Sequence, residues 1–226
     1  MSQSLHFDPE THKLWSEVQA NTMSQSLHFD PETHIYTIDG RRLPSVTQVL
    51  SSVFEPKDYW TEWHRERGIA VHKAVEIIAK GGKVDPSTLD ERIAGRVAGF
   101  ELFLREHPTV EIVWSELRMM HATRFFAGTA DLGLDDKGKP IVADIKGTID
   151  PVTSYPQLGG YSLLWQSTFP KVRPPAEAWG IELTDDGKYK LKIGKRGGRK
   201  ADFDLNEAEQ AWLSILATYN WKKKWL

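Results

Sequence analysis

Residues 128–146, GTADLGLDDKGKPIVADIK, are the stretch of sequence that decides the fold. They read as two β-strands joined by a tight turn at 135–138, whose Asp and Gly residues are typical of a hairpin. Asp131 lies on the first strand, and Asp144 and Lys146 lie on the second. The hairpin would bring two carboxylates and one ammonium group together at the end of a hydrophobic sheet.

The second strand of this hairpin is expected to separate its polar and apolar side chains. Side chains alternate faces along a strand, so Asp144 and Lys146 point to one side and Ile145 to the other, with Ile141 and Ala143. Carboxylates placed this way suit a hard divalent cation such as Mg²⁺, and a lysine beside it could hold or help to deprotonate an attacking water. Alone, such a D-x-K triplet more often belongs to a surface strand with solvated charges. A catalytic role therefore needs support from other motifs in the sequence.

Composition indicates one globular domain. The chain has 226 residues, of which 40% are hydrophobic and 27% charged, and no apolar run approaches the ~20 residues of a membrane span. It contains no cysteine, which excludes disulfides, zinc-thiolate sites and iron–sulfur clusters and suits a cytoplasmic protein. The formal net charge is −2, so affinity for nucleic acid must come from local patches.

The N-terminus carries an identical repeat. MSQSLHFDPETH occurs at residues 1–12 and again, unchanged, at residues 23–34. Structural repeats drift in sequence, so we interpret residues 1–22 as a cloning scar, a second start site or a disordered segment. The domain is therefore expected to span residues 23–226, and residues 1–22 to be dispensable.

The remaining pattern predicts an α/β domain with a central mixed sheet flanked by helices. The sequence reads strand-like from Phe29 through residues 34–38, turns at 39–40 and returns through a strand at 41–43, after which a helix begins near Ser45. Further helices are expected at 57–80, 86–107, 154–168 and 206–224, and strands at 110–119, 125–134, 140–147, 176–183 and 188–194. In the helix at 57–80 we expect Ile69 on the apolar face and Gly68 to permit close packing.

The helix that begins near Ser45 is a candidate anion site. Ser45 and Gln48 have the spacing of a capping box, and Arg41 and Arg42 lie just before them. A helix N-terminus beside two arginines could accept a phosphate, although ordinary capping is the more common explanation of this motif.

Three further motifs accompany the hairpin. Gly68 precedes His72 by four residues on the helix at 57–80, Glu116 lies on the strand before Asp131, and Gln157 and Tyr161 share a helix face at i, i+4. Taken singly, a helix-surface histidine, a solvated glutamate and a buried tyrosine are ordinary features.

In this order, the motifs resemble the RecB-type exonucleases of the PD-(D/E)XK nuclease superfamily. The family pattern is a G-x-x-x-H helix, a strand glutamate, a G-x-x-D strand, a D-x-K strand and a Q-x-x-x-Y helix. The matching residues are Gly68 and His72, Glu116, Gly128 and Asp131, Asp144 and Lys146, and Gln157 and Tyr161. The resemblance covers about residues 60–165, and LPSVTQVL at 43–50 is similar to the start of phage-type members. Iron–sulfur members need four cysteines, so the chain is similar to the cluster-free branch.

The resemblance implies a restriction-endonuclease-like core and a site for one or two Mg²⁺ or Mn²⁺ ions. Asp131, Asp144, the Ile145 carbonyl and His72 would hold the metal, and Glu116 would bind a second ion or a metal-bound water. Lys146 would orient the attacking water, and Gln157 and Tyr161 would position the nucleotide. The product would carry a 5′-phosphate.

Several basic residues are candidate contacts to DNA phosphates. They are Arg65, Arg67 and Lys73 on the histidine-bearing helix, and Lys195, Arg196, Arg199 and Lys200 in the basic run 188–200. A solvated loop is an equally good interpretation of that run.

The leading hypothesis is a metal-dependent DNA exonuclease of phage or bacterial recombination or repair. A restriction-type or structure-specific endonuclease on the same core, or a non-cleaving DNA-binding module, are the alternatives. The implied partners are DNA and a single-strand annealing or binding protein; an oligomer remains open, and a membrane partner is not expected.

Overall fold

The computed structural model describes residues 27–54 and 61–225. The repeated segment at 1–22 and the first residues of the helix expected at 57–80 lie outside the described residues, so those predictions stay untested.

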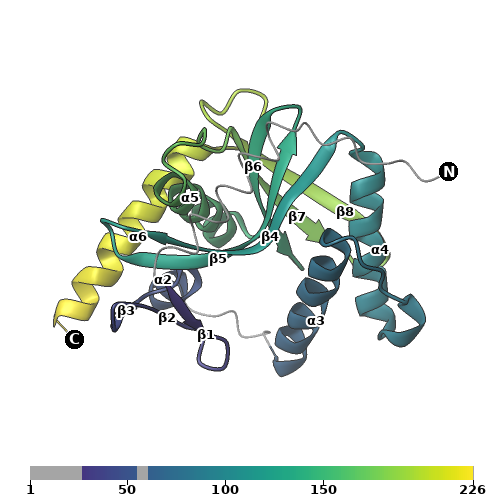
Figure 1. The fold of residues 1–226 in the computed structure, drawn as a ribbon, viewed down its shortest axis with the longest axis horizontal. Coiled ribbons are helices and arrows are strands. Elements are labelled where there is room, and N and C mark those ends of the chain that lie inside the picture. Colours follow the sequence, from purple (N-terminus) through teal and green to yellow (C-terminus); the bar gives the residue numbers. More distant parts are fainter. Residues whose placement is uncertain (1–26, 55–60, 226) are drawn as a thin grey trace.

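The described chain forms a mixed sheet flanked by helices, as the sequence predicts (Figure 1). In chain order the elements are β1 (His28–Asp30), β2 (Ile35–Ile38), β3 (Arg41–Leu43), α2 (Val46–Val53), α3 (Glu62–Ala79), the 3₁₀ helix η1 (Pro86–Thr88), α4 (Glu91–Glu106), β4 (Val110–His121), β5 (Phe126–Asp136), β6 (Lys139–Lys146), α5 (Pro151–Thr168), β7 (Glu177–Leu183), β8 (Tyr189–Lys195), β9 (Phe203–Asp204) and α6 (Leu205–Trp225). Six strands form the main sheet in the order β4-β5-β6-β7-β8-β9, and β1–β3 form a separate small sheet. β6 and β7 are parallel, as are β8 and β9, and the other neighbours in the main sheet are antiparallel.

Two hydrophobic clusters cover the two faces of the main sheet. One joins α2, α5 and α6 to the sheet, with Leu158, Leu164 and Trp212 at its centre. The other joins α3 and α4 to β5–β7, with Phe100 and Phe103 at its centre. Figure 1 shows the two helix groups on opposite sides of the strands. The main sheet is therefore a middle layer, and a site at its edge can receive side chains from both helical layers.

The hairpin predicted at 128–146 is present, with a shorter turn than the sequence indicated. Asp136 pairs with Lys139 across the two strands, which leaves Lys137 and Gly138 as the turn residues. Both have positive φ values, 53° and 82°, which is the type I′ geometry that matches the twist of the flanking strands. Asp135 is part of the strand, and its side chain accepts a hydrogen bond from the Gly138 amide at 2.7 Å.

Two helix boundaries differ from the prediction because of capping. The helix expected at 86–107 is divided into η1 and α4, because Asp90 caps α4 by accepting from the Arg92 amide. α5 begins at Pro151 rather than at 154, because Asp150 accepts from the Val152 amide and proline suits the first helical position. The two-residue strand β9 was not predicted.

The expectation for Ile69 is wrong, and the described residues offer no close contact for Gly68. A methyl group built on Gly68 would meet no described atom within 4 Å, and the Ile69 side chain is 57% exposed. The buried face of α3 is formed by Val71, Ala74 and Val75. No helix within residues 27–54 and 61–225 has the length and apolar character that a membrane crossing requires.

Candidate metal centre

His72, Glu116 and Asp131 come together from three different elements. His72 lies on α3, Glu116 on β4 and Asp131 on β5, and one ligand atom from each lies within 4.8 Å of the others. His72 Nδ1 is 3.3 Å from Asp131 Oδ1 and 3.9 Å from Glu116 Oε1. Ligands about 2.1 Å from an octahedral ion are about 3.0 Å apart when adjacent and about 4.2 Å apart when opposite. The two distances lie within that range, so this donor set fits a divalent cation.

The backbone departs from regular β geometry where the acidic residues meet. Glu116 has φ = +52°, which is uncommon outside glycine, and it lies between the pairs Ser115–Leu132 and Leu117–Ala130. Ala130 packs in the cluster with α5 and Leu132 in the cluster with α3 and α4, although both are even-numbered positions of one strand. The alternation of faces is therefore broken at Asp131. Backbone strain of this kind costs about 1–3 kcal/mol and gathers at functional sites.

Asp131 is held in place by the neighbouring strand. Its Oδ2 accepts a hydrogen bond from the backbone N–H of Ile145 at 2.6 Å, which leaves Oδ1 toward His72. Ile145 thus contributes to the site through its amide. The role that the resemblance gives to its carbonyl stays a prediction.

Asp144 and Lys146 point to the same side of β6, as alternation predicts. Lys146 Nζ is 2.5 Å from Asp144 Oδ2, and Asp144 is only 2% exposed. Ile141, Ala143 and Ile145 pack on the opposite face with α3 and α4. Asp144 lies outside the group of three candidate ligands, so its predicted role as a ligand stays a prediction.

The charges of the site perturb one another strongly. The Asp131 carboxylate raises the pKa of His72 to about 10, even though burial opposes the charged imidazolium. Burial alone would raise the pKa of Asp131, but the His72 imidazolium and the Lys146 ammonium bring it below its usual value. Burial raises the pKa of Asp144 to about 6. Burial would lower the pKa of Lys146, but Asp144 and Asp131 raise it instead, so this lysine is an ammonium ion at neutral pH.

Gln157 and Tyr161 lie together on α5 beside this site. Gln157 Nε2 donates to Tyr161 Oη at 3.0 Å, and both side chains are buried. Burial, with the nearby Asp144 and Asp131 carboxylates, raises the pKa of Tyr161 well above 10, so the phenol stays protonated. A methyl group on Gly128 would lie 3.1 Å from the Tyr161 ring, so glycine at 128 leaves room for that ring.

A cavity of about 300 Å³ adjoins the candidate ligands. Glu116, Gly128 and Tyr161 form the wall it shares with the metal centre. The other walls come from the small sheet and the start of α2: Phe29, His34, Tyr36, Ser45, Val46, Thr47, Arg118 and Thr129. Tyr36 Oη and Thr129 Oγ1 are hydrogen-bonded at 2.6 Å, and the Arg118 guanidinium lies 4.7 Å from the centre of the Phe29 ring. No sequence pattern indicated Tyr36, Arg118 or Thr129, because they converge from three separate strands.

The capping box predicted at Ser45 is present. Ser45 Oγ accepts from the Gln48 amide, and Gln48 Oε1 accepts from the Ser45 amide, each at 3.1 Å. Ordinary capping thus accounts for this motif. Arg41 and Arg42 are exposed, and Arg41 lies over the Phe125 ring, 4.1 Å from its centre.

The candidate phosphate contacts on α3 all have acidic partners. Arg65 pairs with Glu62, and Lys73 pairs with Glu76 at 2.8 Å; both basic side chains are largely exposed. Arg67 is 14% exposed and contacts Asp185 at 3.3 Å, so it is tied to the β7–β8 turn. Arg65 and Lys73 can still reach a ligand, whereas Arg67 cannot do so without losing its partner.

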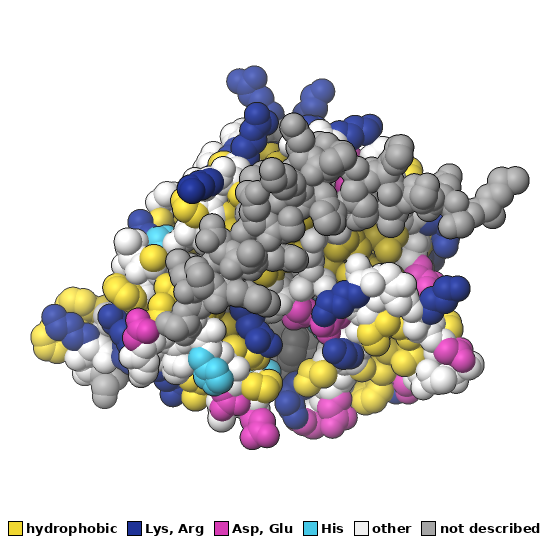
Figure 2. Space-filling view, in the orientation of Figure 1, with side chains coloured by type: hydrophobic (Ala, Val, Ile, Leu, Met, Phe, Trp, Pro, Cys, Tyr) yellow, Lys and Arg dark blue, Asp and Glu magenta, His cyan; other side chains and the backbone are white. Residues whose placement is uncertain are grey.

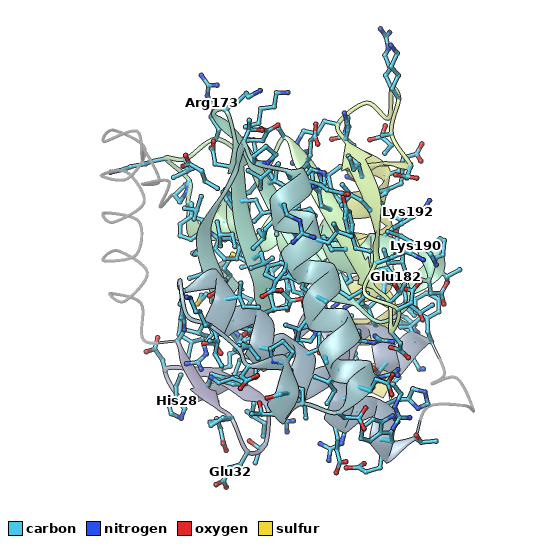
Figure 3. The ribbon with its side chains drawn as sticks, turned by 90° about the vertical axis from the view of Figure 1, so that its right-hand side faces the viewer. His28, Glu32, Arg173, Glu182, Lys190 and Lys192 are labelled. Atoms are coloured by element: carbon cyan, nitrogen blue, oxygen red, sulfur yellow. The ribbon has the colours of Figure 1, made fainter. Side chains whose placement is uncertain are left out.

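The basic run at 188–200 is mostly neutralised by the fold. Lys188, Lys190, Lys192, Lys195 and Arg196 each contact a carboxylate, and Figure 3 shows Lys190 beside Glu182 at the sheet. Within the described part of the chain, no such contact is found for Arg199 and Lys200, which are exposed. The run is therefore a set of ion pairs with two exposed cations at its end.

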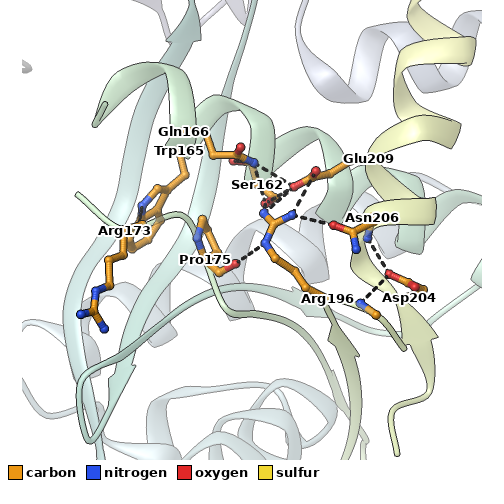
Figure 4. A network of polar contacts seen from close by, with 10 residues as sticks. Ser162, Trp165, Gln166, Arg173, Pro175, Arg196, Asp204, Asn206 and Glu209 are labelled. Carbon is orange, nitrogen blue, oxygen red and sulfur yellow. Dashed lines mark hydrogen bonds and ion pairs between the residues drawn. The ribbon is translucent and has the colours of Figure 1, made fainter. Parts of the chain in front are cut away.

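Arg196 is the centre of a polar network rather than an exposed side chain (Figure 4). It donates to Glu209 at 2.8 Å, Asn206 at 2.9 Å, Ser162 at 3.3 Å and the Pro175 carbonyl at 3.1 Å. Its donors are committed to α5, α6 and the segment before β7. The predicted contact of Arg196 with DNA would require this network to open.

Comparison with known proteins adds little to this geometry. No protein-family model and no curated protein matches the sequence. Among solved structures, a chain described as "Crystal structure of SSO0001" aligns with 96% of this chain and 93% of its own length, at 14% identity and a TM-score of 0.35. A likeness of that size carries no argument, so the functional proposal rests on the residues themselves.

Proposed function

We propose that the chain is a metal-dependent DNA nuclease with a PD-(D/E)XK-type core that cleaves phosphodiester bonds to leave 5′-phosphate ends. One observation carries the proposal: a His72–Glu116–Asp131 donor set on α3, β4 and β5 lies beside the ion pair that buried Asp144 makes with the partly exposed Lys146 on β6. The first can hold a divalent cation, and the second can act on a water molecule. The order of these residues along the chain is the order in the family that the sequence resembles.

The donor set suits Mg²⁺ or Mn²⁺. Glu116 and His72 are about one third exposed, at 34% and 35% of their side-chain surfaces, so an ion can enter from solvent. Two carboxylates and one imidazole leave coordination positions for waters and a phosphate oxygen, and the imidazole favours Mn²⁺ more than an all-oxygen set would. A bound ion would supply Lewis-acid stabilisation of the phosphate and lower the pKa of water.

Lys146 and Asp144 have separate roles in this proposal. Lys146 is an ammonium ion at neutral pH, so it acts as a donor that orients the attacking water and stabilises negative charge on the phosphate. It does not act as the base in that state. Asp144 fixes the direction of the ammonium group through their 2.5 Å contact.

The adjoining cavity is the proposed place for the nucleotide at the cut. It offers an aromatic wall at Phe29 and Tyr36, the Arg118 guanidinium, and the protonated Tyr161 phenol. Aromatic faces stack on bases and a guanidinium pairs with phosphate, which suits a single nucleotide unit. A pocket that takes one terminal nucleotide supports an exonuclease over an endonuclease.

The test is digestion of end-labelled linear DNA in Mg²⁺, in Mn²⁺ and in EDTA. Lys146→Ala and Asp144→Asn should each lower the cleavage rate by at least about 100-fold, because each disturbs charge stabilisation at the reacting phosphate. DNA binding measured in EDTA should persist in both variants. Lys190→Ala is the matched control, since Lys190 is also a sheet lysine paired with a buried carboxylate, Glu182, but lies two strands away.

The outcomes separate the alternatives. Cleavage of linear DNA with intact circular substrates identifies an exonuclease, and cleavage of circular DNA identifies the endonuclease. Full cleavage by Lys146→Ala would refute this assignment of the site. DNA binding without cleavage or Mn²⁺ binding by the unaltered chain would indicate the non-cleaving module.

A further inference from the structure

A second cavity, of about 400 Å³, lies away from the metal centre. It is bounded by the end of β3, the β4–β5 turn and the last turns of α6. Its lining residues are Arg41, Arg42, Pro44, Arg124, Phe125, Tyr219, Asn220 and Lys223. Figure 2 shows basic and hydrophobic side chains together at the left-hand end of the molecule, where α6 ends in Figure 1.

No described carboxylate balances the charge of this cavity. Four of its lining residues are cationic and none is acidic. Among residues 27–54 and 61–225, no carboxylate lies within ion-pair distance of Arg41, Arg42, Arg124 or Lys223, and all four are exposed. The basic run at 188–200 is the contrast, because there five cations contact carboxylates. Four convergent cations without counter-charges form a site for an extended anion.

The walls of the cavity are held in place by bonds that do not use these cations. The Ala127 amide donates to the Pro44 carbonyl at 3.0 Å, which ties the end of β3 to β5. Lys222 Nζ donates to the Ser52 carbonyl at 2.8 Å, which ties α6 to α2.

The β4–β5 turn has a strained residue at the mouth of the cavity. Phe125 has φ = +53° and is 41% exposed, and its ring supports the Arg41 guanidinium at 4.1 Å. A bulky residue at positive φ is a costly conformation that persists only where its surroundings impose it. The Phe125 ring and the Arg41 guanidinium thus form one part of the cavity wall.

We infer that this cavity binds the phosphodiester backbone of the DNA substrate at a distance from the cut. The inference rests on the proposed nuclease function. β5 connects the two sites: five residue steps separate Phe126 from Asp131, which at ~3.4 Å per residue is about 17 Å. At ~3.4 Å per base pair, that distance corresponds to about five base pairs between the reacting phosphate and the bound backbone. The guanidinium groups suit bidentate pairing with phosphate oxygens.

The experiment measures the salt dependence of DNA binding in EDTA, where cleavage does not interfere. Fluorescence anisotropy with labelled 20-nucleotide single strands and 20-base-pair duplexes gives Kd between 50 and 300 mM salt. The variant carries Arg42→Gln, Arg124→Gln and Lys223→Gln, and the matched control carries Lys83→Gln, Arg105→Gln and Lys139→Gln. The control removes the same charge from exposed positions outside both cavities. Thermal unfolding establishes that the triple variant and the triple control are both folded. If the triple variant is not folded, the single variant Arg124→Gln replaces it.

Loss of three phosphate contacts should make the negative slope of log K against log salt shallower, by about 2.7 for duplex DNA and by about 2 for single strands. The control should keep the slope of the unaltered chain. Equal slopes in the variant and the unaltered chain would overturn the inference, as would an equal loss in the control. A shallower slope in the triple variant, with no DNA cleavage by the unaltered chain, would uphold the binding site and refute only the nuclease. DNA cleavage by the unaltered chain, with an unchanged salt slope in the triple variant, would uphold the nuclease and refute the second binding site.

Discussion

Two residues of the candidate metal centre should make the metal-free protein less stable as the pH rises. The folded-state pKa of Asp144 is raised to about 6 and that of His72 to about 10. A group whose pKa is raised by folding contributes stability below its unfolded pKa and loses it as the pH rises through its folded pKa. The stability that Asp144 contributes is therefore lost between about pH 4 and pH 6, and that of His72 between about pH 6.5 and pH 10.

The measurement is the free energy of unfolding in urea with EDTA from pH 4 to pH 10. Compared with Asp144→Asn, the unaltered chain should lose stability between pH 4 and pH 7, because only it must ionise a buried carboxyl group. Compared with His72→Gln, it should lose stability between pH 7 and pH 10. If the difference in unfolding free energy between the unaltered chain and each variant did not vary with pH, the raised pKa values of Asp144 and His72 would be contradicted.

Single residues of the site were predictable where the reasoning was local. Alternation along one strand correctly placed Asp144 and Lys146 on one side and Ile145 on the other. The positive φ of Glu116 and the break in alternation at Asp131 were not predictable, because both arise from the pairing of β4 with β5. The contact of His72 with Asp131 likewise requires α3 to pack on the sheet.

At the scale of elements, two helical glycines should respond oppositely to alanine. A methyl group on Gly159 of α5 would lie 2.4 Å from backbone atoms of Ala208 in α6, so Gly159→Ala must separate two helices. We expect a loss of stability of about 1–3 kcal/mol, as for overpacked cores. Gly68 of α3 meets nothing within 4 Å among the described residues, so Gly68→Ala should gain about 0.5–1 kcal/mol. Urea unfolding of both variants tests the pair.

Gly68→Ala also tests whether the surface of α3 around residue 68 approaches the DNA substrate. Cleavage by the more stable variant should fall if DNA passes close to α3, and should be unchanged if Gly68 has no role in the site. Destabilisation by Gly68→Ala would instead show that the helix surface at Gly68 is covered.

Elements were predictable where their signals lie within a few residues. The hairpin within 128–146, although not the exact length of its turn, and the capping box at Ser45 are of this kind. The neutralisation of the basic run was only partly predictable. Asp186 and Asp202 adjoin the run, but its other partners come from distant elements: Glu177 and Glu182 from β7, and Glu209 from α6. A charge run in a sequence shows which cations exist, and the fold decides which of them remain free.

At the scale of the whole molecule, the candidate metal centre adds a polar link between the helical layer of α3 and α4 and the sheet on which that layer packs. His72 belongs to the helical layer of α3 and α4, whereas Glu116 and Asp131 belong to the sheet. Tyr161, from the opposite helical layer, lies beside them. An ion held by the three ligands would cross-link α3 to β4 and β5 in the folded state only.

Divalent cations should therefore raise the melting temperature. A metal present at 100 times its Kd adds about 2.7 kcal/mol to the folded state, which in a chain of this size raises Tm by about 5–11 °C. The rise should be larger at pH 8 than at pH 6, because a metal must displace the proton of His72. Differential scanning calorimetry with Mn²⁺ should show the rise for the unaltered chain and not for Asp131→Asn. Asp202→Asn is the control, since Asp202 pairs with Lys192 outside the three-ligand group and its loss should leave the rise intact. An equal rise in Asp131→Asn would mean that the stabilising ion binds elsewhere.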